Sequence, residues 1–139
     1  MKKKQAMILV VLGVLTIGIS IGAIWIKSFI SSVAANHDKQ IAAISISNVD
    51  LAIIPDGIYK GSYKVFPVAA TVRVVVRDHK IVDIDLVEHK NGKGSAAEVI
   101  PNKVVETQKL EVDVITGATS SSKVILKAIE NALSGAGKS

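Results

Sequence analysis

The chain has 139 residues, no cysteine, 49% hydrophobic residues and a formal net charge of +5. The absence of cysteine excludes disulfides, thiolate metal sites and iron–sulfur ligation. The charge does not indicate nucleic-acid binding, because residues 36–139 carry 13 Lys/Arg against 12 Asp/Glu and show no basic stripe interleaved with aromatic residues. Most of the excess charge lies at the N-terminus.

The N-terminal part of the chain has the pattern of a membrane anchor. Three lysines at 2–4 precede an apolar run at 6–26 that contains only two hydroxyl residues. As a helix this run spans roughly 32 Å, enough for the hydrocarbon core of a bilayer. Lysines before the run favour a cytoplasmic N-terminus. We expect residues 1–30 to be a cytoplasmic lysine cluster and a single-pass transmembrane helix in the cell membrane, with the rest of the chain extracytoplasmic.

A cleaved signal peptide is the alternative, because residues 32–34 resemble a small-residue cleavage site. Signal-peptide apolar regions are typically about 7–15 residues long, and the longer run here favours a retained anchor. Residues 31–55 are then expected to form a stalk. Its first part, to about Ile46, is compatible with a helix that continues from the anchor, and turn-forming residues up to Pro55 interrupt it.

Residues 56–139 predict one small α+β domain with an antiparallel sheet. The stretch 56–63 begins with an Asp-Gly turn and enters a strand rich in Tyr, Val and Phe. Residues 71–77 then alternate with valines on one face, and after a turn at 78–80 the chain returns at 81–88. The apolar face of this meander is expected to carry Val72, Val74, Val76, Val82, Ile84 and Leu86.

Helices are expected to cover that face. Residues 95–108 predict two short helices split by Pro101, and residues 110–115 look strand-like. From Lys123 onward an amphipathic helix is predicted. Its apolar side carries Val124, Ile125, Ala128, Ile129, Ala132 and Leu133, with Lys127, Glu130 and Asn131 opposite.

Four consecutive hydroxyl residues at 119–122 stand at the start of this last helix and predict its N-cap. The free N–H groups and the dipole of a first helical turn favour a phosphate held nearby. Thr119 supplies an alcohol that a phosphoester needs, and Gly117 and Ala118 leave room beside it; Gly117 can also adopt a positive φ. The simpler alternative is that the hydroxyl residues only cap a helix, with Asp113 as a turn residue.

The pattern Asp-x-x-Thr-Gly-Ala-Thr-x-Ser resembles the flavinylation motif of the FMN-binding domain family, which includes flavin-carrying components of the sodium-pumping NADH:quinone reductase and of the Rnf complexes. In that family a flavin transferase takes FMN from FAD and esterifies its phosphate onto the last hydroxyl residue of the tetrad. By position, the resemblance makes Thr119 the acceptor of covalent FMN. The remaining motif positions are Asp113, Thr116, Gly117, Ala118 and Ser121.

Asp-Gly-x-Tyr-x-Gly at 56–61 extends the resemblance, which covers residues 56–134. His79 departs from it, since family hairpins commonly have glycine there. The chain is also much shorter than the family members in the redox pumps, so we assign it to neither complex.

Two further residues are candidates for flavin contact. His89 ends a strand, and short family members often have a histidine here near the flavin; the alternative is an exposed strand-end residue. Tyr59 could stack on the isoalloxazine, although a strand tyrosine more often packs in a core or at an edge. The histidines lack metal-ligand spacing, and no catalytic triad, Walker loop or dinucleotide fingerprint is present, so we predict no metal site and no catalytic residue.

The resemblance implies a membrane-anchored, extracytoplasmic flavoprotein that relays electrons between the membrane and membrane-bound or extracellular redox partners. It would be an electron-transfer carrier more than a stand-alone enzyme, loaded by a flavin transferase that uses FAD. Two alternatives remain open: a reductase that binds FMN non-covalently, and a surface interaction module without flavin.

Overall fold

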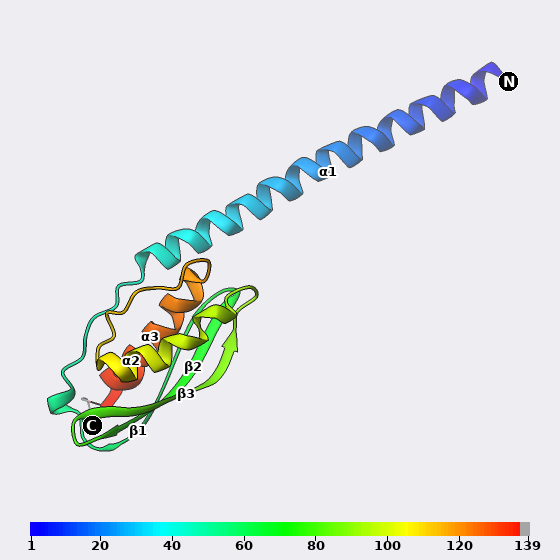
Figure 1. The fold of residues 1–139 in the computed structure, drawn as a ribbon. Helices are drawn as coiled ribbons and strands as arrows, with labels where there is room; N and C mark the ends of the chain where they lie inside the picture. The colour runs from blue at the N-terminus through cyan, green and yellow to red at the C-terminus, as the bar shows by residue number, and fades with distance from the viewer. Residues whose placement is uncertain (137–139) are drawn as a thin grey trace. The chain divides into compact units, whose positions relative to one another are not determined.

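The computed structural model describes residues 1–136 and divides into two compact units, Met1–Asp38 and Lys39–Ser139. Helix α1 (Lys2–Ala43) makes up nearly all of the first unit and is drawn in blue to cyan in Figure 1. Its apolar side chains are exposed, and by length and composition it could cross a membrane. The predicted N-terminal apolar helix is confirmed; a signal sequence would show the same features.

The second unit contains a three-stranded antiparallel sheet in the order β1-β2-β3. The strands are β1 (Gly57–Val65), β2 (Val68–Arg77) and β3 (Lys80–Lys90). Val72, Val74 and Val76 of β2 are fully buried, which confirms the predicted apolar face. The α+β architecture is therefore confirmed.

One predicted position on β3 is wrong. Val82 is 46% exposed, and its neighbour Ile81 is buried instead. The register explains this: Val76 pairs with Ile81 but Val75 pairs with Asp83, so a bulge inserts one extra residue at Val82. A bulge displaces the two-residue alternation, and the sequence pattern cannot show where the alternation shifts.

The hairpin between β2 and β3 turns at Asp78 and His79, which have φ values of 50° and 60°. Two consecutive positive φ angles are the conformation of a type I′ turn, which matches the twist of the strands. His79 therefore adopts a left-handed conformation at the position where the resemblance expected glycine.

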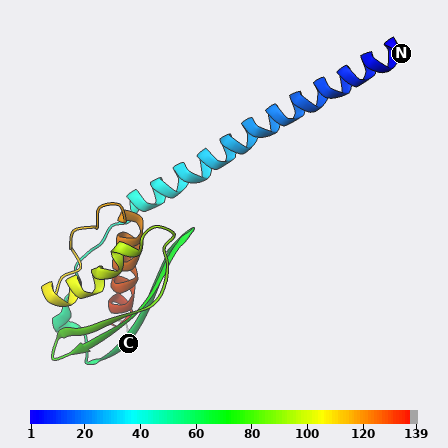
Figure 2. The ribbon, with the colours of Figure 1, turned by 45° about the vertical axis from the view of Figure 1, so that its right-hand side comes forward.

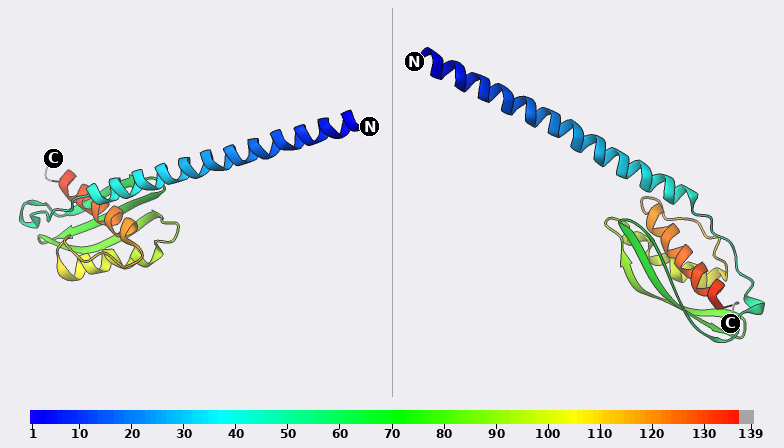
Figure 3. Two further views of the ribbon diagram at one scale, coloured as in Figure 1. Left: turned by 90° about the horizontal axis from the view of Figure 1, so that it is seen from above. Right: turned by 180° about the vertical axis from the view of Figure 1, so that it is seen from behind.

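Helices cover one face of the sheet, as Figure 2 shows. The predicted split before Pro101 is confirmed, because a 3₁₀ turn leads into a short α-helix with Pro101 in its first turn. The last helix packs on β1 and β2 (Figure 3), with all six predicted apolar positions buried. The helical elements of this unit are η1 (Leu51–Ile53), η2 (Ser95–Val99), α2 (Ile100–Thr107) and α3 (Thr119–Ala136), besides the last residues of α1.

The segment 110–115, predicted as strand-like, is irregular rather than a strand. Several of its backbone donors find side-chain acceptors instead of a neighbouring strand. The Leu110 N–H donates to Asn48 Oδ1 at 2.8 Å, and the Ile115 N–H donates to Ser122 Oγ at 3.0 Å. The apolar residues that suggested a strand pack into the core from an irregular segment, as the burial of Leu110 shows.

The segment 39–55, predicted as part of a stalk, packs with the domain. Ile41, Ile44 and Ile54 are buried in the same core as the sheet and α3. The Asn48 side chain accepts two backbone N–H bonds from the segment that follows α2. The folded unit thus begins near Lys39, well before the boundary at 56 that the sequence suggested.

The sheet and α3 pack closely at Gly61. A Cβ added there would lie inside van der Waals contact with the backbone of Ala128 and Ala132. We expect Gly61→Ala to lower the free energy of unfolding by about 1–3 kcal/mol, because backbone cannot give way as a flexible side chain does. The matched control is Gly135→Ala in α3, where a Cβ meets nothing within 4 Å and helix propensity improves. Urea denaturation of both variants checks this; equal stability would mean that α3 does not pack on β1 as described.

Candidate functional site

The motif at 113–122 forms a turn that leads directly into α3. The Ala118 N–H donates to Ile115 O at 2.9 Å, and Gly117 has φ +80°, as a tight turn requires. The helix begins at Thr119. The hydroxyl residues 119–122 are thus its first turn, and the prediction that they precede the helix as a cap is wrong.

Ser122 ties the motif turn to the helix. It is fully buried, accepts a hydrogen bond from the Ile115 N–H and donates one to Ala118 O at 2.8 Å. Ala118 is also buried. The first bond gives the Ile115 N–H an acceptor, while Ala118 O also accepts from the Ser122 N–H. Ser122 is therefore a structural residue, and nothing in its sequence position separates it from the other three hydroxyl residues.

Thr119 is exposed at the first position of α3. Beside it, a Cβ added to Gly117 would meet nothing within 4 Å, so the approach to the turn is open. The first turn of a helix leaves backbone N–H groups without partners along the helix, and the dipole there favours an anion. An alcohol, open space and N–H donors together fit a phosphate attached at Thr119.

The other motif residues differ in exposure. Asp113 is exposed in the loop before the turn, and Thr116 is exposed within the turn. Ser121 is buried against Gly94, where an added Cβ would overlap the Ser121 hydroxyl. Ser121 thus packs the loop after β3 against the start of α3. Its side chain does not line an open site.

His89 lies near the end of the domain where α3 begins. It is close to the end of β3, and the loop that follows contacts Ser121 through Gly94. Its side chain is 3% exposed, so the interpretation as an exposed strand-end residue is wrong. Its Nδ1 lies 3.0 Å from Glu98 Oε1, and its buried Nε2 has no hydrogen-bond partner among residues 1–136. A buried polar atom without a partner suggests a group that another molecule can satisfy.

Sequence reasoning missed the two residues that hold His89. Glu98 stands on η2, and the amide of Asn91 lies 3.2 Å from Glu98 Oε1 and 3.3 Å from His89 Nδ1. A carboxylate and an amide separated by a loop leave no periodic pattern in the sequence. Their contact with His89 could therefore not be predicted and is seen only in the folded chain. His89 and Glu98 border a groove of about 510 Å³ between β3 and α2. Its lining residues are Arg73, Asp83, Ile84, Asp85, Leu86, His89, Glu98, Pro101 and Asn102.

The structure does not bring Tyr59 beside Thr119. Tyr59 donates from its hydroxyl to Pro55 O at 2.7 Å and is part of the packing around the core. It stands two residues before Gly61, which packs on the C-terminal half of α3. The opposite end of the sheet lies nearer the motif, because Gly94, which follows β3, contacts Ser121.

Comparisons with known proteins match the part of the chain that contains this site. Residues 67–134 match the model of the FMN-binding domain. The chain is also similar to the NADH:acrylate oxidoreductase of Vibrio harveyi, with 39% identity over 69 residues. That stretch is 48% of this chain but only 7% of the relative, so the likeness concerns one domain of a much larger protein. Residues 67–134, which hold β2, β3 and the motif turn, are therefore identified as an FMN-binding domain.

Proposed function

We propose that this protein is a membrane-anchored electron carrier with FMN joined to Thr119 through a phosphoester. The observation that carries the proposal is the position of Thr119: an exposed alcohol at the first position of α3, beside the open turn at Gly117, inside an FMN-binding domain. Burial of Ser121 and Ser122 leaves those two serines less accessible as acceptors.

The attachment reaction uses FAD as the donor. The Thr119 oxygen forms a new bond to the phosphorus of the FMN half, the phosphoanhydride bond of FAD breaks, AMP leaves and the alcohol proton is released. The negative phosphodiester is then held at the start of α3, where N–H donors and the helix dipole stabilise it. Bound FMN supplies one- and two-electron redox chemistry. The chain's own residues hold the phosphate and position the ring.

His89 supports the ring-binding part of the proposal. Its unpartnered Nε2 lies buried close to the end of β3, and Glu98 and Asn91 hold the imidazole on its other nitrogen. An imidazole fixed in this way presents one nitrogen in a defined direction, which suits a hydrogen bond to a polar edge of a ligand. Asp113 is exposed and is proposed as a recognition residue for the transferase.

The apolar N-terminal helix supports the role as an electron carrier. An apolar N-terminal helix tethers a small domain, and a tether raises the effective concentration of a carrier near partners in the membrane. The lysines at 2–4 favour a cytoplasmic N-terminus and an extracytoplasmic domain. The name of the Vibrio harveyi relative also points to redox chemistry. A non-covalent FMN reductase is the second candidate, and the family match favours either over a module without flavin.

Covalent attachment is tested by co-expression of the exported full chain with a flavin transferase. We expect a yellow protein whose flavin fluorescence stays on the band in a denaturing gel, with an intact mass raised by FMN less one water. Expression without the transferase is the control and should give the unmodified mass. A protein that releases all its FMN on denaturation would favour the non-covalent reductase, and one that never binds flavin would contradict both.

A further inference from the structure

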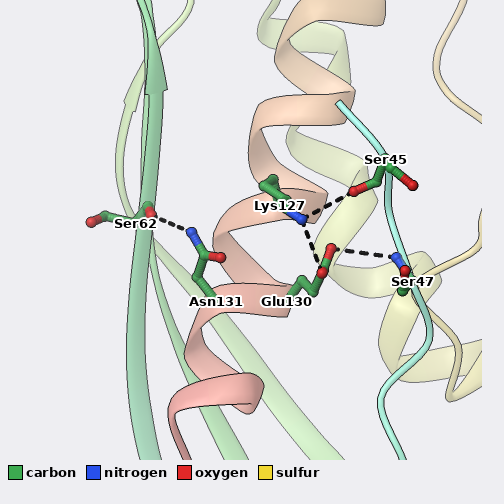
Figure 4. Close-up of polar contacts among 6 residues, drawn as sticks. All are labelled: Ser45, Ser47, Ser62, Lys127, Glu130 and Asn131. Carbon is green, nitrogen blue, oxygen red and sulfur yellow. Dashed lines mark hydrogen bonds and ion pairs between the residues drawn. The ribbon is translucent and has the colours of Figure 1, made fainter. Parts of the chain in front are cut away.

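The two outer strands of the sheet have side chains bonded to their free edges. On β1, Ser62 O accepts a hydrogen bond from Asn131 Nδ2 of α3 at 3.0 Å, as Figure 4 shows. On β3, Gln108 bonds both backbone groups of Ile81. Its Oε1 accepts from the Ile81 N–H at 2.8 Å, and its Nε2 donates to Ile81 O at 2.7 Å. At one position on each edge, a side chain thus takes the place of a neighbouring strand.

The bonds to Gln108 identify the backbone groups of β3 that face away from β2. In an antiparallel pair, every second residue points its N–H and C=O away from the neighbouring strand, and Ile81 is one of these. The pairing with β2 has one extra residue on each side of the segment 83–86, so within it the outward residues are Ile84 and Leu86. In the part of the chain that the structure describes, no hydrogen bond from outside the sheet reaches their backbone groups.

Open space lies beside this part of the strand. Ile84 and Leu86 line the groove of about 510 Å³ between β3 and α2, and Pro101 and Asn102 of α2 line it as well. A free strand edge beside a groove is the arrangement in which an extended peptide adds a strand to a sheet. Main-chain hydrogen bonds then give affinity, and the alternate side chains give specificity.

The charges at this edge select the kind of peptide. Asp83 and Asp85 alternate with the outward residues, so their side chains lie on the sheet face opposite the helices. Asp85 forms an ion pair of 2.6 Å with Arg73, whereas Asp83 is exposed. Glu98 adds a third carboxylate to the lining of the groove. Because opposite charges on neighbouring strands stabilise a sheet, this edge favours lysine or arginine on an added strand.

We propose that residues 83–86 of β3 dock an extended segment of a partner protein by strand addition, with lysine or arginine at alternate positions of that segment. The basic side chains lie beside Asp83 and Asp85, and the residues between them bond the backbone of Ile84 and Leu86. The added strand is short, because a bulge stands at each end of the docking stretch. A second copy of β3 is disfavoured, since it would bring its own aspartates to the same edge. The inference does not depend on the flavin.

Amide hydrogen exchange resolved by NMR tests the edge in the full chain in detergent micelles. We expect slower exchange at Ile81, whose N–H is bonded to Gln108, than at Ile84 and Leu86. The peptide Lys-Val-Lys-Val-Lys should slow exchange at Ile84 and Leu86 about tenfold at about nine-tenths occupancy, because only the free fraction exchanges. No change on adding the peptide would overturn the proposal. Protection that needs no peptide and rises with protein concentration would assign the edge to a second copy and also overturn it.

A matched peptide separates strand pairing from charge attraction. Methylation of the two valine nitrogens keeps every lysine but removes the N–H groups that pair with Ile84 and Leu86. This peptide should give no protection at either residue. Equal protection by both peptides would show that charge alone attracts them, which would overturn strand addition.

Two charge reversals test the selectivity of the docking stretch. Asp83→Lys should weaken binding of the lysine peptide about fivefold, because it places a like charge beside the added strand. Glu111→Lys is the matched control: it makes the same change in net charge at an exposed residue outside the groove and should leave the affinity unchanged. Equal weakening by both variants would mean non-specific attraction and overturn the proposal. Circular dichroism verifies that each variant is folded.

Discussion

Thr119→Ala is expected to abolish covalent flavin while the domain stays folded. Thr119 is exposed at the first position of α3, so the loss of its hydroxyl removes the acceptor without opening a cavity in the core. Flavin fluorescence on a denaturing gel and peptide mapping measure the loss. A Thr119→Ala protein that stays yellow after denaturation would contradict the assignment.

Neighbouring alcohols provide the controls for Thr119→Ala. Thr119→Ser should retain some attachment, because the alcohol remains, and Ser120→Ala should keep it. Ser122→Ala is a poorer control than its sequence position suggests, because it leaves the buried Ile115 N–H without its acceptor and costs about 1–3 kcal/mol. Flavin that moves to Thr116 or Ser120 in Thr119→Ala would show that exposure, rather than the motif, selects the acceptor.

Asp113→Ala extends the same test to recognition. Asp113 is exposed in the loop that precedes the turn. Its loss should therefore reduce attachment without unfolding the domain. A full level of flavin on this variant would mean that the acid is only a loop residue.

Ile129→Asp is expected to unfold the domain. Ile129 is fully buried in the core formed by α3 and the sheet. A carboxylate there would have no partner, at a cost of about 3–5 kcal/mol, a large part of the stability of a small domain. Flavin attachment should be lost with the fold, since the motif turn is held by α3. Urea denaturation followed by circular dichroism measures the change.

Ser134→Asp is the matched control for Ile129→Asp, because Ser134 is exposed on the same helix. It should cost no more than about 1 kcal/mol, the size of an acidic residue's interaction with the C-terminal end of a helix dipole. Equal tolerance of aspartate at both positions would mean that the helical phase is misassigned. Ile125→Asp should behave as Ile129→Asp does, since Ile125 is equally buried.

The local elements of this protein follow from its sequence. The valines at 72, 74 and 76 and the apolar side of α3 have the periods of a strand and a helix, and all lie in the core. Periodicity reports burial directly, because side chains repeat every two residues on a strand and every 3.6 on a helix. The motif and the candidate acceptor Thr119 were readable because their residues are contiguous in the sequence.

Tertiary structure decided the contacts between distant segments. The bulge at Val82, the irregular path at 110–115 and the contact of the buried His89 side chain with Glu98 all depend on partners elsewhere in the chain. Lys127 and Glu130 have the sequence pattern of a solvated side of α3, whereas residues 45–47 contact both and their side chains are only 25% and 14% exposed. A polar residue has the same pattern whether it faces water or a buried backbone carbonyl. Only the folded chain supplies the carbonyl, so only the tertiary structure could distinguish the two.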